Sequence, residues 1–103
     1  MSVLMEFAMF PTDKGESVSP FVSRIIKMID ETGHDYRLTP MGTVVETNTL
    51  EETLEIVEKA YTLLEADCNR VYSTIKLDIR KGASNCLEGK VKAVEDRIGK
   101  VKK

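Results

Sequence analysis

Three polar features of this 103-residue sequence could contact a small ligand. Glu6 is the one carboxylate in an otherwise apolar strand, so it needs a cation or a donor, and Lys76 is a candidate. Ser17 and Ser19 stand at the start of a helix, where hydroxyls and free N–H groups bind polar ligands. The segment Met41-Gly42-Thr43 enters a strand, where glycine lets another backbone approach closely. Each feature also has a structural explanation, namely an ion pair, a helix cap and a tight bend.

Catalytic and metal-binding motifs are absent from the sequence. His34 is the single histidine and has no cysteine near it, whereas a metal site needs several ligands at defined spacing. Cys68 and Cys86 are far apart and are expected to be free thiols. No phosphate-binding glycine motif and no recognisable nucleophile–base pair occurs. We therefore expect no enzymatic activity, no metal and no cofactor.

The composition is that of one small folded domain, spanning residues 1–103. It is 42% hydrophobic and 31% charged, with a formal net charge of -2. No stretch approaches the ~20 apolar residues of a membrane span, and the start lacks the basic residues of a secretory signal. Basic residues gather after residue 70, but acidic residues interrupt them, which favours solvated faces over a nucleic-acid site. We expect a cytoplasmic protein that contacts neither membrane nor nucleic acid.

Hydrophobic periodicity predicts an α+β fold. Strands are predicted over residues 3–10, 35–38, 43–47 and 70–80, and helices over 20–32, 50–64 and 87–101. With right-handed crossovers, the first six elements form the ferredoxin-like βαββαβ sandwich. Its antiparallel sheet has the first and third strands at its centre and helices on one face. The last helix is an addition to this plan.

Helix ends carry specific signals. Ser19 followed by Pro20 predicts an N-cap and a first helical position, and Gly33 suits the left-handed residue after the helix. Thr49 and Glu52 have the spacing of a capping box, which predicts the start of the second helix.

Apolar faces indicate what each element should bury. The second helix has an inner stripe at Leu50, Leu54, Val57, Tyr61 and Leu64. The C-terminal helix has 4-3-4-3 spacing at Leu87, Val91, Val94, Ile98 and Val101, which predicts packing in a groove of the domain or of a partner helix. The first strand has one entirely apolar face, made of Val3, Met5, Phe7 and Met9. Its other face is also mostly apolar, so the second cover is expected from another subunit. The last strand alternates cleanly between an apolar face and a polar one.

Four segments together resemble the small thiamine-binding proteins of YkoF-like, ferredoxin-like fold, long grouped as an uncharacterised protein family. They are Glu6 with Phe10-Pro11, Ser17-Val18-Ser19-Pro20-Phe21-Val22, Met41-Gly42-Thr43-Val44-Val45-Glu46, and the strand from Arg70 to Arg80. The resemblance runs through almost the whole chain in unchanged order.

This resemblance implies a cytoplasmic homotetramer, a dimer of dimers, that binds thiamine or its hydroxymethylpyrimidine moiety without catalysis. It implies five ligand-binding residues: Ser17, Ser19, Thr43, Glu46 and Lys76. Hydroxyls and a carboxylate suit an aminopyrimidine, which presents alternating donors and acceptors. The alternative is an oligomeric interaction or regulatory protein of the same fold without a pyrimidine ligand.

Overall fold

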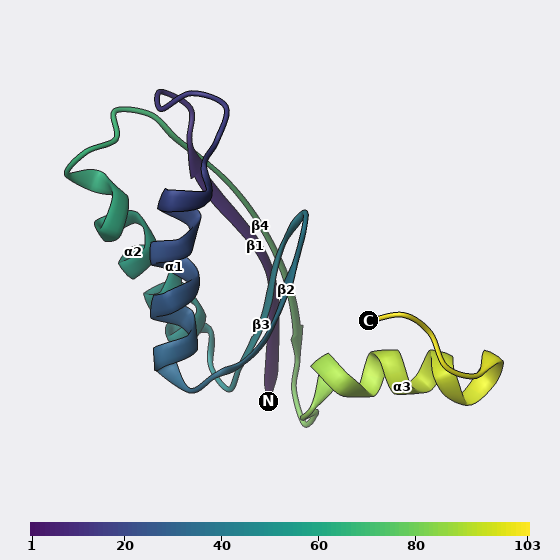
Figure 1. Cartoon of the computed structure of the whole chain (residues 1–103). Helices are drawn as coiled ribbons and strands as arrows, with labels where there is room; N and C mark the ends of the chain where they lie inside the picture. Colours follow the sequence, from purple (N-terminus) through teal and green to yellow (C-terminus); the bar gives the residue numbers. More distant parts are fainter.

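A computed structural model describes all 103 residues (Figure 1). The elements are β1 (Ser2–Pro11), α1 (Ser19–Thr32), β2 (Asp35–Thr39), β3 (Gly42–Thr47), α2 (Leu50–Glu65), β4 (Val71–Arg80) and α3 (Cys86–Ile98). The four strands form one antiparallel sheet in the order β2-β3-β1-β4. The predicted ferredoxin-like plan, with β1 and β3 central and an added C-terminal helix, is confirmed.

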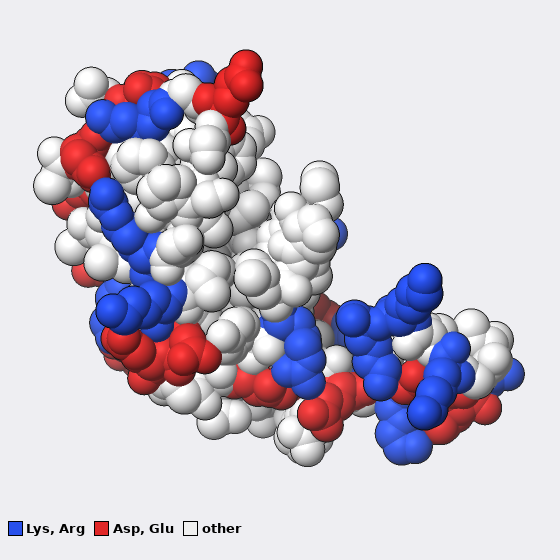
Figure 2. All heavy atoms as spheres, in the orientation of Figure 1, with Lys and Arg blue, Asp and Glu red and all other residues white.

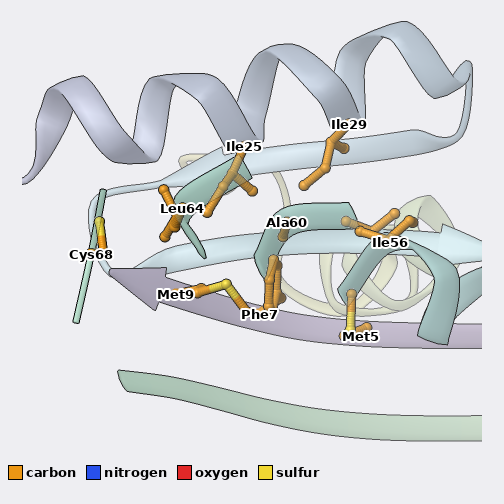
Figure 3. Packing of buried hydrophobic residues seen from close by; sticks show 10 residues of the cluster. Met5, Phe7, Met9, Ile25, Ile29, Ile56, Ala60, Leu64 and Cys68 are labelled. Carbon is orange, nitrogen blue, oxygen red and sulfur yellow. The ribbon is translucent and has the colours of Figure 1, made fainter. Parts of the chain in front are cut away.

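The main core lies between the sheet and helices α1 and α2 (Figure 3). Successive side chains of a strand point to opposite faces of the sheet, so every second side chain of β1 lies under the helices. The core comprises Met5, Phe7, Met9, Ile25, Ile29, Val45, Ile56, Ala60, Leu64 and Cys68. The predicted inner face of β1 is therefore confirmed.

The stripe that α2 buries differs from the predicted one. Its buried residues are Thr53, Ile56, Ala60 and Leu64. Leu50, Leu54 and Tyr61, which the pattern placed inside, are exposed. Two contacts explain the rotation: the Thr53 hydroxyl lies 2.6 Å from that of Thr47, and Arg24 of α1 donates a hydrogen bond to the Leu63 carbonyl. A satisfied threonine can occupy a core position, which an apolar pattern does not count.

Helix ends agree with the sequence signals at two of three positions. The Thr49 hydroxyl accepts a 3.1 Å hydrogen bond from the Glu52 N–H, so the capping box forms. Gly33 ends α1 in the left-handed conformation, with φ 80°. The N-cap of α1, however, is Val18, and Ser19 is already the first helical residue, with no side-chain cap. The Val18 carbonyl accepts hydrogen bonds from the N–H groups of Phe21 and Val22 at 3.0 Å, so the first turn begins one residue earlier than the motif indicates. None of the helices could cross a membrane.

Helix α3 projects from the face of the sheet opposite to α1 and α2 (Figure 1). Cys86 and Leu87 pack on Leu4 beside Val44, and they form a second small core. Beyond this first turn the predicted apolar seam of α3 is largely uncovered: Val94 is exposed, and Ile98 is 72% exposed. Lys and Arg side chains interleave with acidic ones along α3 (Figure 2). Within one chain, therefore, only the start of the predicted seam is packed.

Candidate functional site

A hollow of about 290 Å³ lies between the N-terminal part of α1 and the hairpin that joins β2 to β3. Its floor is the second half of β1, from Phe7 to Phe10. Ten of its fourteen lining residues are hydrophobic, so it suits a small, flat group with a few polar atoms. A shallower groove continues along α1 past Ser19 and Lys27, and both hollows share Val22 on their wall.

The hairpin beside the hollow has a local cause. The Thr39 hydroxyl donates to the Gly42 carbonyl at 2.8 Å and accepts from the Met41 N–H at 3.3 Å, which closes the turn around Pro40. A Cβ on Gly42 would lie 3.2 Å from the Phe7 carbonyl oxygen. Glycine therefore lets β3 begin close against β1, as the sequence predicted, and the residues of the hairpin line one wall of the hollow.

Thr43 supplies the unpaired polar group of this hollow. The residue is only 4% exposed and lines the cavity, and its hydroxyl has no hydrogen-bond partner within the chain. No fully enclosed side-chain oxygen or nitrogen of the protein lacks a partner, so the Thr43 hydroxyl must be accessible from the cavity. A hydroxyl can both donate and accept, so the Thr43 side chain could pair with a polar group that enters the cavity.

Ser17 and Ser19 lie near the rim rather than inside. Ser17 is exposed in the loop before α1, and Ser19 borders the shallower groove. The Ser19 carbonyl accepts a 2.7 Å hydrogen bond from the Ser23 hydroxyl, whereas the Ser19 hydroxyl has no partner within the chain. Ser19 is therefore available to the polar edge of a ligand that extends out of the hollow.

Glu46 lies at the other end of β3 and on the opposite face of the sheet. Its carboxylate accepts hydrogen bonds from the Ser2 hydroxyl at 2.5 Å and from the N–H groups of Cys86 at 2.9 Å and Leu87 at 3.2 Å. Burial raises the pKa of Glu46, but these three donors outweigh burial, and the pKa lies below its usual range. In one chain, Glu46 thus caps α3, whose own N-cap Asn85 makes no side-chain cap.

Lys76 also lies on the face away from α1 and α2. Its ammonium is 2.9 Å from a carboxylate oxygen of Glu6, which confirms the predicted cross-strand neighbours. Both side chains are more than half exposed, so Glu6 is not buried in a single chain and the pair contributes at most about 1 kcal/mol to stability.

The five residues implied by the resemblance therefore do not meet in one cavity of a single chain. Thr43 and Ser19 border the two connected hollows, and Ser17 precedes them in the loop, whereas Glu46 and Lys76 lie on the far face of the sheet. Sequence reasoning missed most of the lining, because its members come from three elements that also look like ordinary core and turn. It also missed the donors of Glu46, which lie forty residues away in sequence.

The remaining reactive groups lie elsewhere. His34 Nε2 is 3.9 Å from a carboxylate oxygen of Glu52. No group of three or more His, Cys, Asp or Glu side chains is placed to hold a metal ion. Cys68 and Cys86 are both buried and unpaired. Burial, and then the negative charge of Asp67, raises the pKa of the Cys68 thiol, which disfavours a nucleophilic thiolate.

The chain is thus a small α+β domain of ferredoxin-like type with an apolar hollow beside its central strands. Residues 5–95 match the model of the family described as "Thiamine-binding protein", and the chain belongs to this family. The match covers β2, β3, β4, most of β1 and most of α3, so it includes the hollow, Glu46 and the Cys86 and Leu87 donors, and begins after Ser2.

Relatives of similar length support the assignment. A UPF0045 protein of Mycobacterium bovis is 34% identical over 95 residues, which cover 92% of this chain and 93% of that protein. A UPF0045 protein of Methanocaldococcus jannaschii is 35% identical over 92 residues, covering 89% and 91%. Its crystal structure matches this fold with a TM-score of 0.81, over 92% of this chain and 97% of the other.

A more distant structure shows the fold alone. It is that of a Thermotoga maritima protein described as a candidate for thiamine biosynthesis or salvage. The two chains are 23% identical, with a TM-score of 0.78 over 91% of this chain and 99% of the other.

Proposed function

We propose that this protein binds thiamine, or its hydroxymethylpyrimidine moiety, in the cytoplasm and without catalysis. Family membership supports the ligand class. The observation that carries the proposal is the hydroxyl of Thr43, which has no partner within the chain and is accessible on the wall of an apolar hollow. A hydroxyl both donates and accepts, so it can pair with either kind of pyrimidine ring atom.

The hollow favours the pyrimidine part of the ligand. Its apolar walls suit the two faces of an aromatic ring, and Thr43 can contact a polar edge. Ser19 is the next free hydroxyl on the way out of the cavity. Lys27 is the one charged residue on the walls of the two hollows, so the cationic thiazolium of thiamine has no carboxylate partner there. Hydroxymethylpyrimidine should therefore bind at least as tightly as thiamine.

Glu46 and Lys76 could join such a site only in an assembly, because in one chain the sheet separates them from Thr43. We propose a homotetramer, arranged as a dimer of dimers, in which the face of the sheet that carries α3 is covered by another copy. The supporting observation is apolar surface on that face. Phe10 and Tyr72 contact each other there, with ring centroids 5.9 Å apart and ring planes tilted by 44°. Val94 and Ile98 extend the exposed apolar seam of α3.

Two measurements test this proposal. Isothermal titration of the purified protein with hydroxymethylpyrimidine and with thiamine should give saturable binding, whereas pyridine should give none. Native mass spectrometry of the same sample should show a tetramer and any retained ligand. A tetramer that binds neither compound would contradict the ligand proposal and would favour an interaction protein that uses the open α3 seam.

A further inference from the structure

The two edges of the sheet are built differently. Edge strand β2 has five residues, and its Arg37 and Asp35 side chains form an ion pair of 3.0 Å. Edge strand β4 has ten residues and no strand partner on its outer side. Short, charged edges resist pairing with another chain, whereas long edges with apolar side chains invite it. Strand β4 is therefore the edge at which a further strand could add.

The apolar face of β4 is not covered within one chain. Ile75, Leu77 and Ile79 lie on the side of α1 and α2, yet they are 41–45% exposed. Removing such side chains from water is favourable, so a partner that covered them would stabilise the joined strands. The sequence predicted an apolar face on this strand, and the structure leaves it open.

Helix α2 adds apolar surface on the same side. Leu63 lies on its flank toward α1, where Arg24 reaches the Leu63 carbonyl. Successive helix residues are 100° apart, which places Leu54 and Tyr61 about 160–180° away from Leu63, on the opposite flank. Both side chains are exposed. Since the crossover from β3 to β4 passes over β1, this flank of α2 faces toward the β4 edge.

We propose that β4 pairs in antiparallel fashion with β4 of a second copy, about a two-fold axis at Leu77, so that one sheet runs through both copies. A two-fold axis perpendicular to the sheet keeps the helices of both copies on one face and places one β4 residue opposite itself. The exposed flanks of the two α2 helices then border the joined apolar strip of Ile75, Leu77 and Ile79 from each side.

The side chains of β4 select this register. With Leu77 on the axis, Ile75 lies opposite the partner's Ile79, so all three exposed apolar residues pair with apolar residues. On the other face, Lys76 lies opposite the partner's Asp78. Cross-strand pairs of opposite charge stabilise a sheet, and like charges destabilise it.

Neighbouring registers lose these matches. An axis at Lys76 sets two lysines opposite each other, and an axis at Asp78 does the same with two carboxylates. An axis at Ile75 sets Leu77 opposite the partner's Ser73. In the proposed register positive and negative charges alternate across the interface. Glu6 pairs with Lys76, Lys76 lies opposite the partner's Asp78, and within each chain Asp78 pairs with Lys90.

This pairing does not depend on the proposed ligand, because the hollow lies on the other side of β1 from β4. It differs from the covering of the α3 face proposed above and would supply the second kind of interface that a dimer of dimers requires.

The first test places a charge on the axis. In Leu77→Lys, two ammonium groups would meet across the joint, and the mass measured by light scattering at micromolar concentration should fall by half. Leu38→Lys is the control, because Leu38 is an exposed apolar residue on the other edge strand, and its mass should match wild type. Far-UV circular dichroism confirms folding. A monomeric wild type, or an unchanged mass for folded Leu77→Lys, would overturn the proposal.

The second test exchanges the charges and stays informative if Leu77→Lys does not fold. In Lys76→Glu, each of the two equivalent pairs across the interface would set a glutamate opposite the partner's Asp78. The dissociation constant of the dimer should therefore rise roughly tenfold. Adding Asp78→Lys restores opposite charges across the joint and should recover most of the affinity. Within one chain, the double variant places like charges beside both Glu6 and Lys90. If these two residues acted only within the single chain, the double variant would therefore dimerise no better than Lys76→Glu alone. That result would refute the register.

Discussion

The carboxylate of Glu46 accepts a 2.9 Å hydrogen bond from the backbone N–H of Cys86, and this contact fixes α3 to β3. Free N–H groups at a helix start carry partial positive charge, so a carboxylate from elsewhere in the chain can replace a local cap. The Leu87 N–H shares the same carboxylate at 3.2 Å. A residue forty positions earlier thus holds the start of α3, together with the packing of Cys86 and Leu87 on Leu4.

Replacing Glu46 with Gln should loosen α3. The variant keeps the size of the side chain but loses its charge, and a hydrogen bond to a charged group contributes roughly 1.5–3 kcal/mol. We expect faster hydrogen exchange of α3 amides and a free energy of unfolding lower by about that amount. The control is Glu88→Gln in the same first turn, because the carboxylate of Glu88 makes only an exposed 3.4 Å ion pair with Arg37, and its loss should change stability by less than about 1 kcal/mol. Titration of the same variant with hydroxymethylpyrimidine shows whether Glu46 also contacts a ligand in the assembly.

The contribution of Glu46 to stability should disappear in acid. Its folded pKa lies below the unfolded value, so the unfolded state binds more protons at intermediate pH. The stabilisation is complete above the usual carboxylate range and is lost as pH falls through the folded pKa. We expect the difference in melting temperature between wild type and Glu46→Gln to shrink over that interval. A difference that is constant with pH would contradict this account.

Thr43→Val removes the free hydroxyl of the hollow and nearly keeps its shape. Since this hydroxyl has no partner in the chain, stability should stay the same or rise. Binding of hydroxymethylpyrimidine should weaken by roughly 0.5–1.5 kcal/mol, about threefold to tenfold in Kd. Thr47→Val is the matched control, because the Thr47 hydroxyl is bonded to Thr53 and to the Thr49 carbonyl. That variant should lose stability and keep its affinity, and the reverse pattern would exclude Thr43 from the site.

Two glycine substitutions should act in opposite directions. In Gly42→Ala the new Cβ would lie 3.2 Å from the Phe7 carbonyl oxygen, a backbone atom of a central strand that cannot easily move. We expect a loss of stability of about 1 kcal/mol or more. In Gly89→Ala the Cβ meets open space within α3, so stability should rise by about 0.5–1 kcal/mol. Chemical denaturation measures both, and equal effects would argue against the close approach of β3 to β1.

The open seam of α3 should be required for assembly. Replacing Val94 and Ile98 together with Ser removes exposed apolar groups, so the fold should persist while the mass in light scattering falls. The control replaces Lys92 and Asp96, an ion pair at i and i+4 on the same helix, with Ser. Its mass should equal that of wild type. Identical masses for both double variants would show that the seam is not an interface.

Local chemistry in the sequence determined much of this protein. The alternation of Val3, Met5, Phe7 and Met9 indicated the buried face of β1, and the Thr49–Glu52 spacing located the start of α2. The order of strands and helices, with right-handed crossovers, fixed the sheet order and hence the contact between Glu6 and Lys76. These features follow from interactions of near neighbours and from strand pairing, which a pattern of residue types records.

Only the tertiary structure decided which side chains share a site. Thr53 is buried and Leu54 exposed because the rotation of α2 depends on its contacts with α1 and with Thr47, not on its own periodicity. Within one chain, Glu46 caps α3, because the loop after β4 returns the chain to that end of β3. Such contacts join residues tens of positions apart, and their energies depend on distances that residue types and spacing along the chain do not contain.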